Sequence, residues 1–366
     1  MMTGRQRVNA IFNRKTSDRC GFWLGKPTDG AELLYRKHFG ISAGSVGIDK
    51  DIGKVSSYHM DEGDVTLAAM LNSDLMWIAP DLDPNTYKHP EGKPIFDTYG
   101  GKSAASHGTP GVFAESEDLS DIENFDWPNP DYLDFSNTED LINKSISEGM
   151  AVFCSSWGHF FHIACRFFGM EEYFIKMHTS PKVVQAVTER IVDFQLECNK
   201  RIFESFSGKL DCVFFGNDLG SQISTLIGLQ QFEEFILPYM KKIIDQAKKY
   251  NLKTALHSCG AIAEFLPLMI DAGIDAIHPL QAKAVGMDAI SLAREYKDDL
   301  IFIGGVDTQE LLPLGTPEQV KDEVRRLVDI LSPGYIVSPS HEAILPNVPI
   351  DNILAMREAV LEMTRA

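Results

Sequence analysis

The chain alternates short apolar runs with longer amphipathic runs, and this alternation constrains its fold more than any other feature. Eight apolar runs have the length of buried strands, at residues 21–24, 75–78, 151–155, 211–215, 254–257, 276–279, 301–304 and 335–338. Between most of them, apolar residues recur at helical spacing, as in 181–205, 230–250 and 318–331. Strand–helix alternation predicts a parallel sheet, and eight such units predict a closed (β/α)₈ TIM barrel of the α/β class.

Two segments add to this plan. Residues 3–13 predict an N-terminal helix that Thr3 caps, with Val8, Ile11 and Phe12 on its apolar face. Residues 81–143 are rich in Pro, Gly, Asp and Asn, and they predict a long insertion after the second strand. We expect small strands at 96–98 and 112–113 within it, and a lid or wall over the site. The chain 1–366 is therefore interpreted as one barrel domain; a doubly wound sheet is the alternative, but no G-x-G-x-x-G follows the first strand.

The charge balance narrows the possible partners. The 52 acidic and 34 basic residues give a net charge of −18, which argues against nucleic acid and anionic membranes as partners. No apolar run approaches the roughly 20 residues that span a bilayer, and the first residues lack the apolar core of a signal peptide. The six cysteines contain no C-x-x-C pair, and about five are interpreted as buried free thiols. We therefore expect a cytoplasmic protein.

Polar residues follow nearly every predicted strand, where the working residues of a barrel enzyme lie. They are residues 155–159, 216–222, His257 and Cys259, His278 and Gln281, residues 305–307, and His341 and Glu342; residues 72–74 were placed beside or after the second strand. The intervening helices are ordinary in composition. This asymmetry indicates an active-site face at one end of the barrel.

His257 and Cys259 form the most informative pair. Residues two apart in a strand point the same way, so an imidazole and a thiol project side by side where the strand ends at Gly260. This pair suits zinc. If His341 joins them, three protein ligands leave a fourth position that Asp218 or Glu342 could fill, which is the pattern of catalytic zinc. Such a zinc would stabilise negative charge on a thiolate, an alkoxide or an ether oxygen.

Each of these residues also has a purely structural interpretation. His257 could be a buried histidine with a satisfied hydrogen bond, and His341 could face solvent in a turn. Asp218 and Asp307 could cap the helices that follow them. Trp157 suits a core or pocket wall better than chemistry. His159 and His278 stay undecided on sequence alone.

Several motifs together resemble the uroporphyrinogen decarboxylase superfamily. They are NDLGSQ at 217–222, LHSCG at 256–260, IGGVD at 303–307, YIVSPSHE at 335–342 and PNVPIDNI at 346–353. The resemblance runs from about residue 150 to the C-terminus, is looser over 1–80, and leaves 81–143 unplaced. It implies the (β/α)₈ fold and one of two chemistries.

The first chemistry is metal-free decarboxylation of a porphyrinogen that carries many carboxylates. Members with this activity have an Arg-Gln-Ala-Gly-Arg segment after the first strand, whereas residues 21–29 here read GFWLGKPTD, with one lysine and no arginine. Such a site would neutralise a polyanion poorly. The second chemistry belongs to the cobalamin-dependent methyltransferases, which this chain is similar to through His257-x-Cys259. Their third zinc ligand is a cysteine at a position that corresponds here to His341, and this difference puts a thiol substrate in doubt.

The resemblance therefore predicts a zinc-dependent methyltransferase. Its metal ligands would be His257, Cys259 and His341, with Asp218 and His341 as catalytic residues and Asp218 as acid–base or fourth ligand. The substrate pocket would be lined by Trp157, His159, Asn217, Gln222 and Asp307. The chain has no corrinoid-binding Asp-x-His-x-x-Gly, so a partner protein would supply the corrinoid (cobalamin), and the other partner would be a small methyl donor or acceptor. The alternatives are a metal-free lyase that uses Asp74 and His341, and a non-catalytic binding barrel.

Overall fold

Eight parallel strands form the centre of the molecule. The computed structural model describes residues 1–44, 60–83, 85–102, 104–106 and 108–364. Its strands run in the order β1-β8-β7-β6-β5-β4-β3-β2, all neighbours parallel. The predicted (β/α)₈ barrel is confirmed, and each predicted strand is present: β1 Gly21–Phe22, β2 Leu75–Ile78, β3 Ala151–Cys154, β4 Cys212–Gly216, β5 Lys253–His257, β6 Ala276–Leu280, β7 Ile301–Val306 and β8 Tyr335–Pro339.

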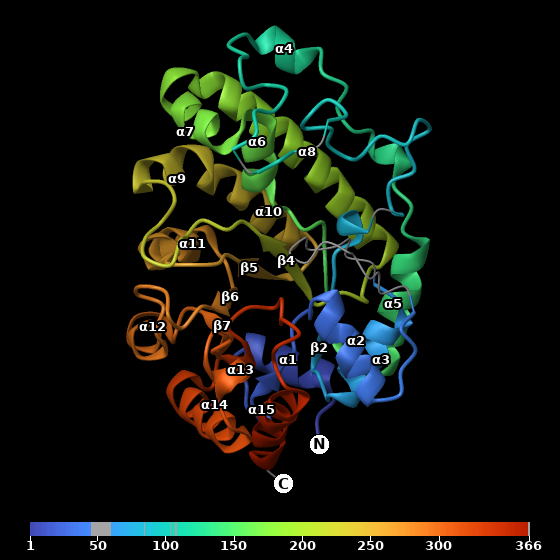
Figure 1. Cartoon of the computed structure of the whole chain (residues 1–366), viewed down its shortest axis with the longest axis vertical. Helices are drawn as coiled ribbons and strands as arrows, with labels where there is room; N and C mark the ends of the chain where they lie inside the picture. Colours follow the sequence, from blue (N-terminus) through green and yellow to red (C-terminus); the bar gives the residue numbers. More distant parts are fainter. Residues whose placement is uncertain (45–59, 84, 103, 107, 365–366) are drawn as a thin grey trace.

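Helices surround the strands on the outside (Figure 1). Helix α8 has the predicted bounds, and α14 opens with the predicted cap at Thr316. The helix predicted over 230–250 is two helices, because Pro238 in the first turn of α10 cannot donate a hydrogen bond to the preceding turn. The outer helices are α2 Asp29–His38, α3 Glu62–Met70, α5 Ser136–Ser147, α6 Phe160–Phe168, α7 Met170–Thr179, α8 Pro181–Ser205, α9 Leu229–Phe235, α10 Leu237–Lys249, α11 Leu266–Ala272, α12 Ala289–Tyr296, α13 Leu311–Leu314, α14 Pro317–Leu331 and α15 Ile350–Glu362. Within the described residues, no helix combines the length and the apolar character needed to cross a bilayer.

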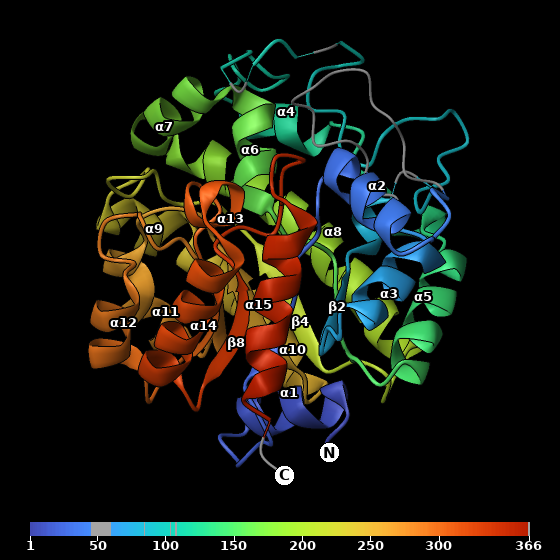
Figure 2. The ribbon, with the colours of Figure 1, turned by 60° about the horizontal axis from the view of Figure 1, so that its bottom comes forward.

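The N-terminal helix α1, Gly4–Phe12, closes the end of the barrel from which the strands start (Figure 2). Thr3 caps it as predicted, in a reciprocal pair of hydrogen bonds with Gln6. Val8, Ile11 and Phe12 belong to the same buried cluster as the inward-facing strand side chains. Helix α1 therefore closes the barrel at the end where the strands begin. A functional site is expected at the opposite end, where the strands finish.

Asp74 links β1 and β2, the two strands at the ends of the strand order, between which the described residues form no ladder. Its backbone N–H donates to the Phe22 carbonyl at 2.8 Å, and its carboxylate accepts from the Phe22 N–H at 2.8 Å. The same carboxylate is paired with Arg7 at 2.5 Å and with Arg19 at 2.7 Å. Residues 72–74 lie next to the second strand, which is one of the two predicted placements, and they do not follow it. Asp74 precedes β2, at the closed end of the barrel, where it serves as a structural ion pair.

The insertion after β2 lies against the outside of the barrel wall. Tyr87 and Phe96 pack on Phe194 of α8, and Phe113 stacks on Phe167 of α6 with ring centroids 5.2 Å apart. The small strands predicted at 96–98 and 112–113 are absent from the described residues. In their place lie the one-turn helix α4, Leu119–Glu123, two short 3₁₀ turns (η1 Pro80–Leu82 and η2 Pro130–Tyr132), and an isolated bridge between Tyr87 and Leu133. Because α5 begins at Ser136, the irregular part ends earlier than predicted.

Candidate metal centre

His257 and Cys259 meet at the open end of the barrel, as their spacing predicts. His257 is the last residue of β5 and is 3% exposed. The Sγ atom of Cys259 lies 3.4 Å from its Nε2. Cys259 is partly exposed, whereas the other five cysteines are buried. The strand therefore presents a nitrogen and a sulfur together at the mouth.

Asp218, from the loop after β4, completes a compact group with this pair. Its Oδ1 lies 3.2 Å from His257 Nε2 and accepts the backbone N–H of Cys259 at 2.9 Å. Its other oxygen lies 3.6 Å from Nε2 of His162 on α6. Ligand atoms of Asp218, His257 and Cys259 all lie within 4.8 Å of one another. A carboxylate, an imidazole and a thiol thus converge on one point.

Glu342 and His341 approach His257 from the loop after β8. The buried Oε2 of Glu342 lies 3.5 Å from His257 Nδ1 and 3.5 Å from His341 Nδ1. The His341 ring stands nearly perpendicular to that of His257, with centroids 6.1 Å apart, and it is close enough to Cys259 for the sulfur to raise its pKa. His341 therefore borders the group that Asp218, His257 and Cys259 form, but it is not within that group.

The charged groups at the open end of the barrel raise the pKa values of His257 and His341. Burial alone lowers the pKa of His257, but the Glu342 carboxylate, Cys259 and Asp218 outweigh burial and raise it well above its usual value. For His341, burial is likewise outweighed by Glu342 and Cys259, and its pKa rises to about 9. Burial raises the pKa of Asp218, yet the His257 partner brings it well below the usual range. The carboxylates and the histidine rings of the site therefore favour each other's charged forms.

The donor atoms fit zinc. Zinc takes imidazole nitrogen, thiolate sulfur and carboxylate oxygen in a four-coordinate arrangement, and all three kinds are present around His257. A second group, His257, His278 and Glu342, gathers at the Nδ1 side of the same ring without a sulfur. The set that includes Cys259 is the better match to a soft divalent metal, and it is also the more accessible of the two.

Trp157 forms an apolar wall beside these ligands. Its ring centroid lies 5.2 Å from that of His257 and 4.7 Å from that of Trp77. A Cβ atom at Gly216 would lie 2.3 Å from the Trp157 ring, so the indole depends on the absence of a side chain there. Asp81 fixes the backbone, because its two carboxylate oxygens accept Trp157 N–H and Ser156 Oγ–H, each at 2.8 Å. The indole thus stands beside His257, and its role as a pocket wall stays a prediction.

The other residues predicted to line the pocket differ in burial and in their hydrogen-bond partners. Asn217 is fully buried and bridges Phe161 N–H and the Gly158 carbonyl, and Asp307 accepts three backbone N–H bonds at the start of the loop before α13. Both therefore have structural roles. Gln222 is exposed at the rim and accepts a hydrogen bond from Gln281 at 2.7 Å. His159 stands at the start of α6, where burial lowers the pKa of its ring well below the usual value.

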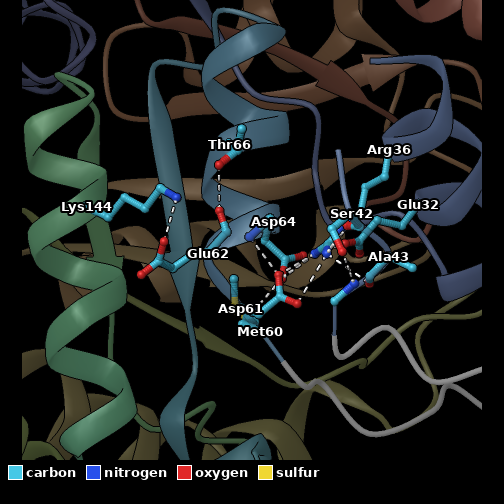
Figure 3. Close-up of polar contacts among 12 residues, drawn as sticks. Glu32, Arg36, Ser42, Ala43, Met60, Asp61, Glu62, Asp64, Thr66 and Lys144 are labelled. Atoms are coloured by element: carbon cyan, nitrogen blue, oxygen red, sulfur yellow. Dashed lines mark hydrogen bonds and ion pairs between the residues drawn. The ribbon is translucent and has the colours of Figure 1, made fainter. Parts of the chain in front are cut away.

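Lys26, the basic residue after β1, is already neutralised. It contacts both Glu32, at 2.5 Å, and Asp64. Arg36 pairs with the same two carboxylates and with Asp61, and Figure 3 shows Arg36 enclosed by these acids. Lys26 therefore offers no free positive charge to a polycarboxylate substrate. Since Asp74 lies at the opposite end of the barrel from His341, the geometry also disfavours the metal-free lyase that would use both.

His162 and Asp81 were missed in the sequence. His162 follows His159 by three residues at the start of a helix, so the His-x-x-His spacing was the available signal for it. Asp81 sits in a Pro- and Asp-rich stretch that reads as loop. Its contact with Ser156 and Trp157 joins segments 75 residues apart, and no local pattern reveals it.

Comparison with known proteins gives a consistent result. The model of the uroporphyrinogen decarboxylase (URO-D) family matches residues 108–363. A methylcobamide:CoM methyltransferase MtbA of Methanosarcina acetivorans is 30% identical over 168 residues, 45% of this chain and 47% of that protein. A methylated-thiol–coenzyme M methyltransferase of Methanosarcina mazei is 26% identical over 175 residues, 46% of this chain and 42% of that protein. The alignments span about half the length of these curated relatives.

A solved structure described as a methyltransferase from Methanosarcina mazei superposes with a TM-score of 0.64. It covers 99% of both chains at 13% sequence identity, so it supports the fold alone.

Proposed function

Since this chain belongs to the uroporphyrinogen decarboxylase family, we propose that it is the methyltransferase type of member and not a decarboxylase. In this proposal it moves a methyl group between a small substrate, namely a methyl ether, a methylamine-type compound or a thiol, and a corrinoid on a partner protein. The observation that carries the proposal is the convergence of Asp218, His257 and Cys259 at the barrel mouth. The names of the relatives, which mention methylcobamide and coenzyme M, support the same chemistry.

Zinc is the metal that these residues would hold. His257 Nε2 and Cys259 Sγ face each other, Asp218 reaches the same point, and His341 borders it. Bound zinc would supply Lewis acidity, which stabilises negative charge on a heteroatom that gains or loses a methyl group. When Asp218 is not a ligand, it would stay ionised beside the His257 ring, so its carboxylate is placed to receive a proton and not to hold one at rest. Trp157 would exclude water on one side.

In this proposal a separate partner protein carries the corrinoid, in keeping with the methylcobamide that the name of a relative mentions. A corrinoid supplies either the nucleophile that accepts the methyl group or the methyl group itself. The mouth is ringed by loops after β4, β5, β6 and β8, whose side chains Gln222, Cys259, Gln281 and His341 stand at its edge. These loops would face the partner.

Elemental analysis of the purified protein tests the metal. We expect about one zinc per chain in the wild type, and loss of most of it in Cys259→Ser. His341→Ala and Asp218→Asn, compared in the same preparation, rank the third ligand. Cys20→Ala is the matched control, since Cys20 is buried far from the mouth and should leave zinc unchanged. If protein purified without chelators takes up no added zinc, the proposal is overturned. The metal-free lyase and the non-catalytic binding barrel would then be the functions to test.

Methyl transfer is then tested with free methylcobalamin and a set of small thiols that includes coenzyme M. The absorbance change on loss of the cobalt-bound methyl group reports the reaction, and Cys259→Ser is the negative control. The reverse direction uses reduced cobalamin with methyl ethers and methylamines. Zinc-loaded protein that is inactive in both directions, also with a corrinoid protein present, would favour the non-catalytic binding barrel.

A further inference from the structure

His278 is the neighbour of His257 on the side away from Cys259. The two residues are paired in register on the adjacent strands β5 and β6, and their Nδ1 atoms lie 3.0 Å apart. Both rings are almost fully buried, with exposed fractions of 3% for His257 and 1% for His278. A contact of this length between two ring nitrogens requires one proton between them, so one ring donates and the other accepts.

The surroundings decide which ring donates. His257 Nε2 faces Cys259 Sγ at 3.4 Å and Asp218 Oδ1 at 3.2 Å, so a metal held at that point would take Nε2 and leave the ring proton on Nδ1. His278 lies between the rings of Trp23, 5.0 Å away, and Phe214, 5.4 Å away, and such apolar contacts disfavour a second proton on it. His257 Nδ1–H therefore donates, and His278 Nδ1 accepts.

The rest of the His278 ring has no competing polar role. Among the residues that the structure describes, its buried Nε2 has no hydrogen-bond partner. The His278 ring forms its hydrogen bond with His257, through Nδ1. A histidine needed only for packing could be replaced by an apolar side chain of similar length, whereas this one has its acceptor nitrogen directed at the candidate ligand.

We propose that His278 is a positioning residue, which holds the proton of His257 on Nδ1 and leaves Nε2 as the metal-facing nitrogen toward Cys259 and Asp218. This inference deepens the proposed function and rests on it, because it takes His257 as a zinc ligand. Metal-binding histidines generally donate their second nitrogen to a fixed acceptor, and loss of that acceptor typically costs about 10–100-fold in metal affinity or activity. Here the acceptor would be a neutral imidazole.

The test compares His278→Asn with His278→Leu. The two side chains have nearly the same shape, but only the asparagine amide oxygen can accept the His257 proton. Zinc affinity is measured by competition with a chromophoric chelator, and thermal unfolding of the metal-free proteins controls for folding. We expect His278→Leu to bind zinc about 10–100-fold more weakly than the wild type, and His278→Asn to recover most of that loss. Equal affinities for the two variants, at equal stability, would overturn the inference.

A second measurement reads the proton directly. In protein with ¹⁵N-labelled histidine, the imidazole coupling pattern of zinc-loaded His257 should show hydrogen on Nδ1 and none on Nε2. Hydrogen on Nε2 with the metal bound to Nδ1 would overturn the inference and favour the group of His257, His278 and Glu342. A wild type without zinc affinity would instead contradict the proposed function, so the two failures are distinguishable.

Discussion

The Nε2 atom of His257 lies 3.2 Å from Oδ1 of Asp218, and this pair occupies the position where a metal bound by His257 and Cys259 would sit. The Asp218 carboxylate helps to raise the pKa of His257, so the ring binds a second proton more readily than a free imidazole does. Binding of a metal must remove that proton. The pair is therefore both the resting state of the site and a competitor of the metal.

The first prediction concerns this competition. The pKa of His257 is raised well above its usual value, because Glu342, Cys259 and Asp218 outweigh burial. Its proton is thus still bound at neutral pH, and zinc affinity should rise with pH by about tenfold per pH unit for each proton displaced. Competition titrations at pH 6, 7 and 8 measure the slope. A zinc affinity that does not change over this range would contradict the assignment of His257 as a ligand.

The second prediction concerns Arg36. Its guanidinium is 1% exposed and pairs with Glu32 and Asp64, so Arg36→Met leaves these two buried carboxylates with Lys26 as their one remaining cation among the described residues. We expect a loss of about 3–5 kcal/mol in the free energy of unfolding, measured by urea denaturation. The matched control is Arg325→Met, because Arg325 is 42% exposed in a surface network and its loss should cost at most about 1 kcal/mol. Similar losses in the two variants would show that the buried cluster is not a structural element.

The barrel was predictable because each strand is buried on both faces. Such strands appear as continuous apolar runs, and α1, α8 and α14 carry their start signals at Thr3, Pro181 and Thr316. The small strands predicted around Phe96 and Phe113 are absent from the described residues, because the apolar character of these positions has another cause. Both side chains pack on helices α6 and α8, and burial against a helix leaves the same apolar signature as burial in a sheet.

The His257–Cys259 pair was predictable from the period of a strand, which sets the direction of both side chains. The relation of His341 to Glu342 was not. They are adjacent in a turn, where no period fixes which side chain faces inward, and the structure buries Glu342 while His341 stays partly exposed. Asp81, His162 and His278 come from other loops and strands. These residues reach the site because the closed barrel brings distant segments together, and no local sequence pattern records such contacts.

The third prediction concerns the indole at the mouth. Because a Cβ at Gly216 would lie 2.3 Å from Trp157, Gly216→Ala should displace the ring and destabilise the fold by about 1–3 kcal/mol. Trp157→Leu in the same chain should relieve most of that penalty, and a double-mutant cycle by urea denaturation measures the coupling. Additive effects of the two substitutions would mean that Gly216 is not what positions the indole.

The last prediction concerns Asp81, whose carboxylate holds the Trp157 backbone without a cation beside it. Burial raises its pKa to about 6, although Trp157 N–H and Ser156 oppose that shift. The folded protein thus keeps the Asp81 proton from about pH 4, where an unfolded aspartate loses it, up to about pH 6. In this window the folded state holds more protons, so the contribution of Asp81 to stability is present at low pH and is lost as pH rises through 6.

Asp81→Asn removes this titration and keeps the shape of the side chain. The stability of the variant relative to the wild type should therefore increase by about 2–3 kcal/mol between pH 4 and pH 7, and then stay constant. Urea denaturation of both proteins at half-unit pH steps gives the difference, in which the titration of all other groups cancels. A difference that is flat with pH, or that falls as pH rises, would show that Asp81 titrates as an ordinary carboxyl group and that its two hydrogen bonds offset its burial.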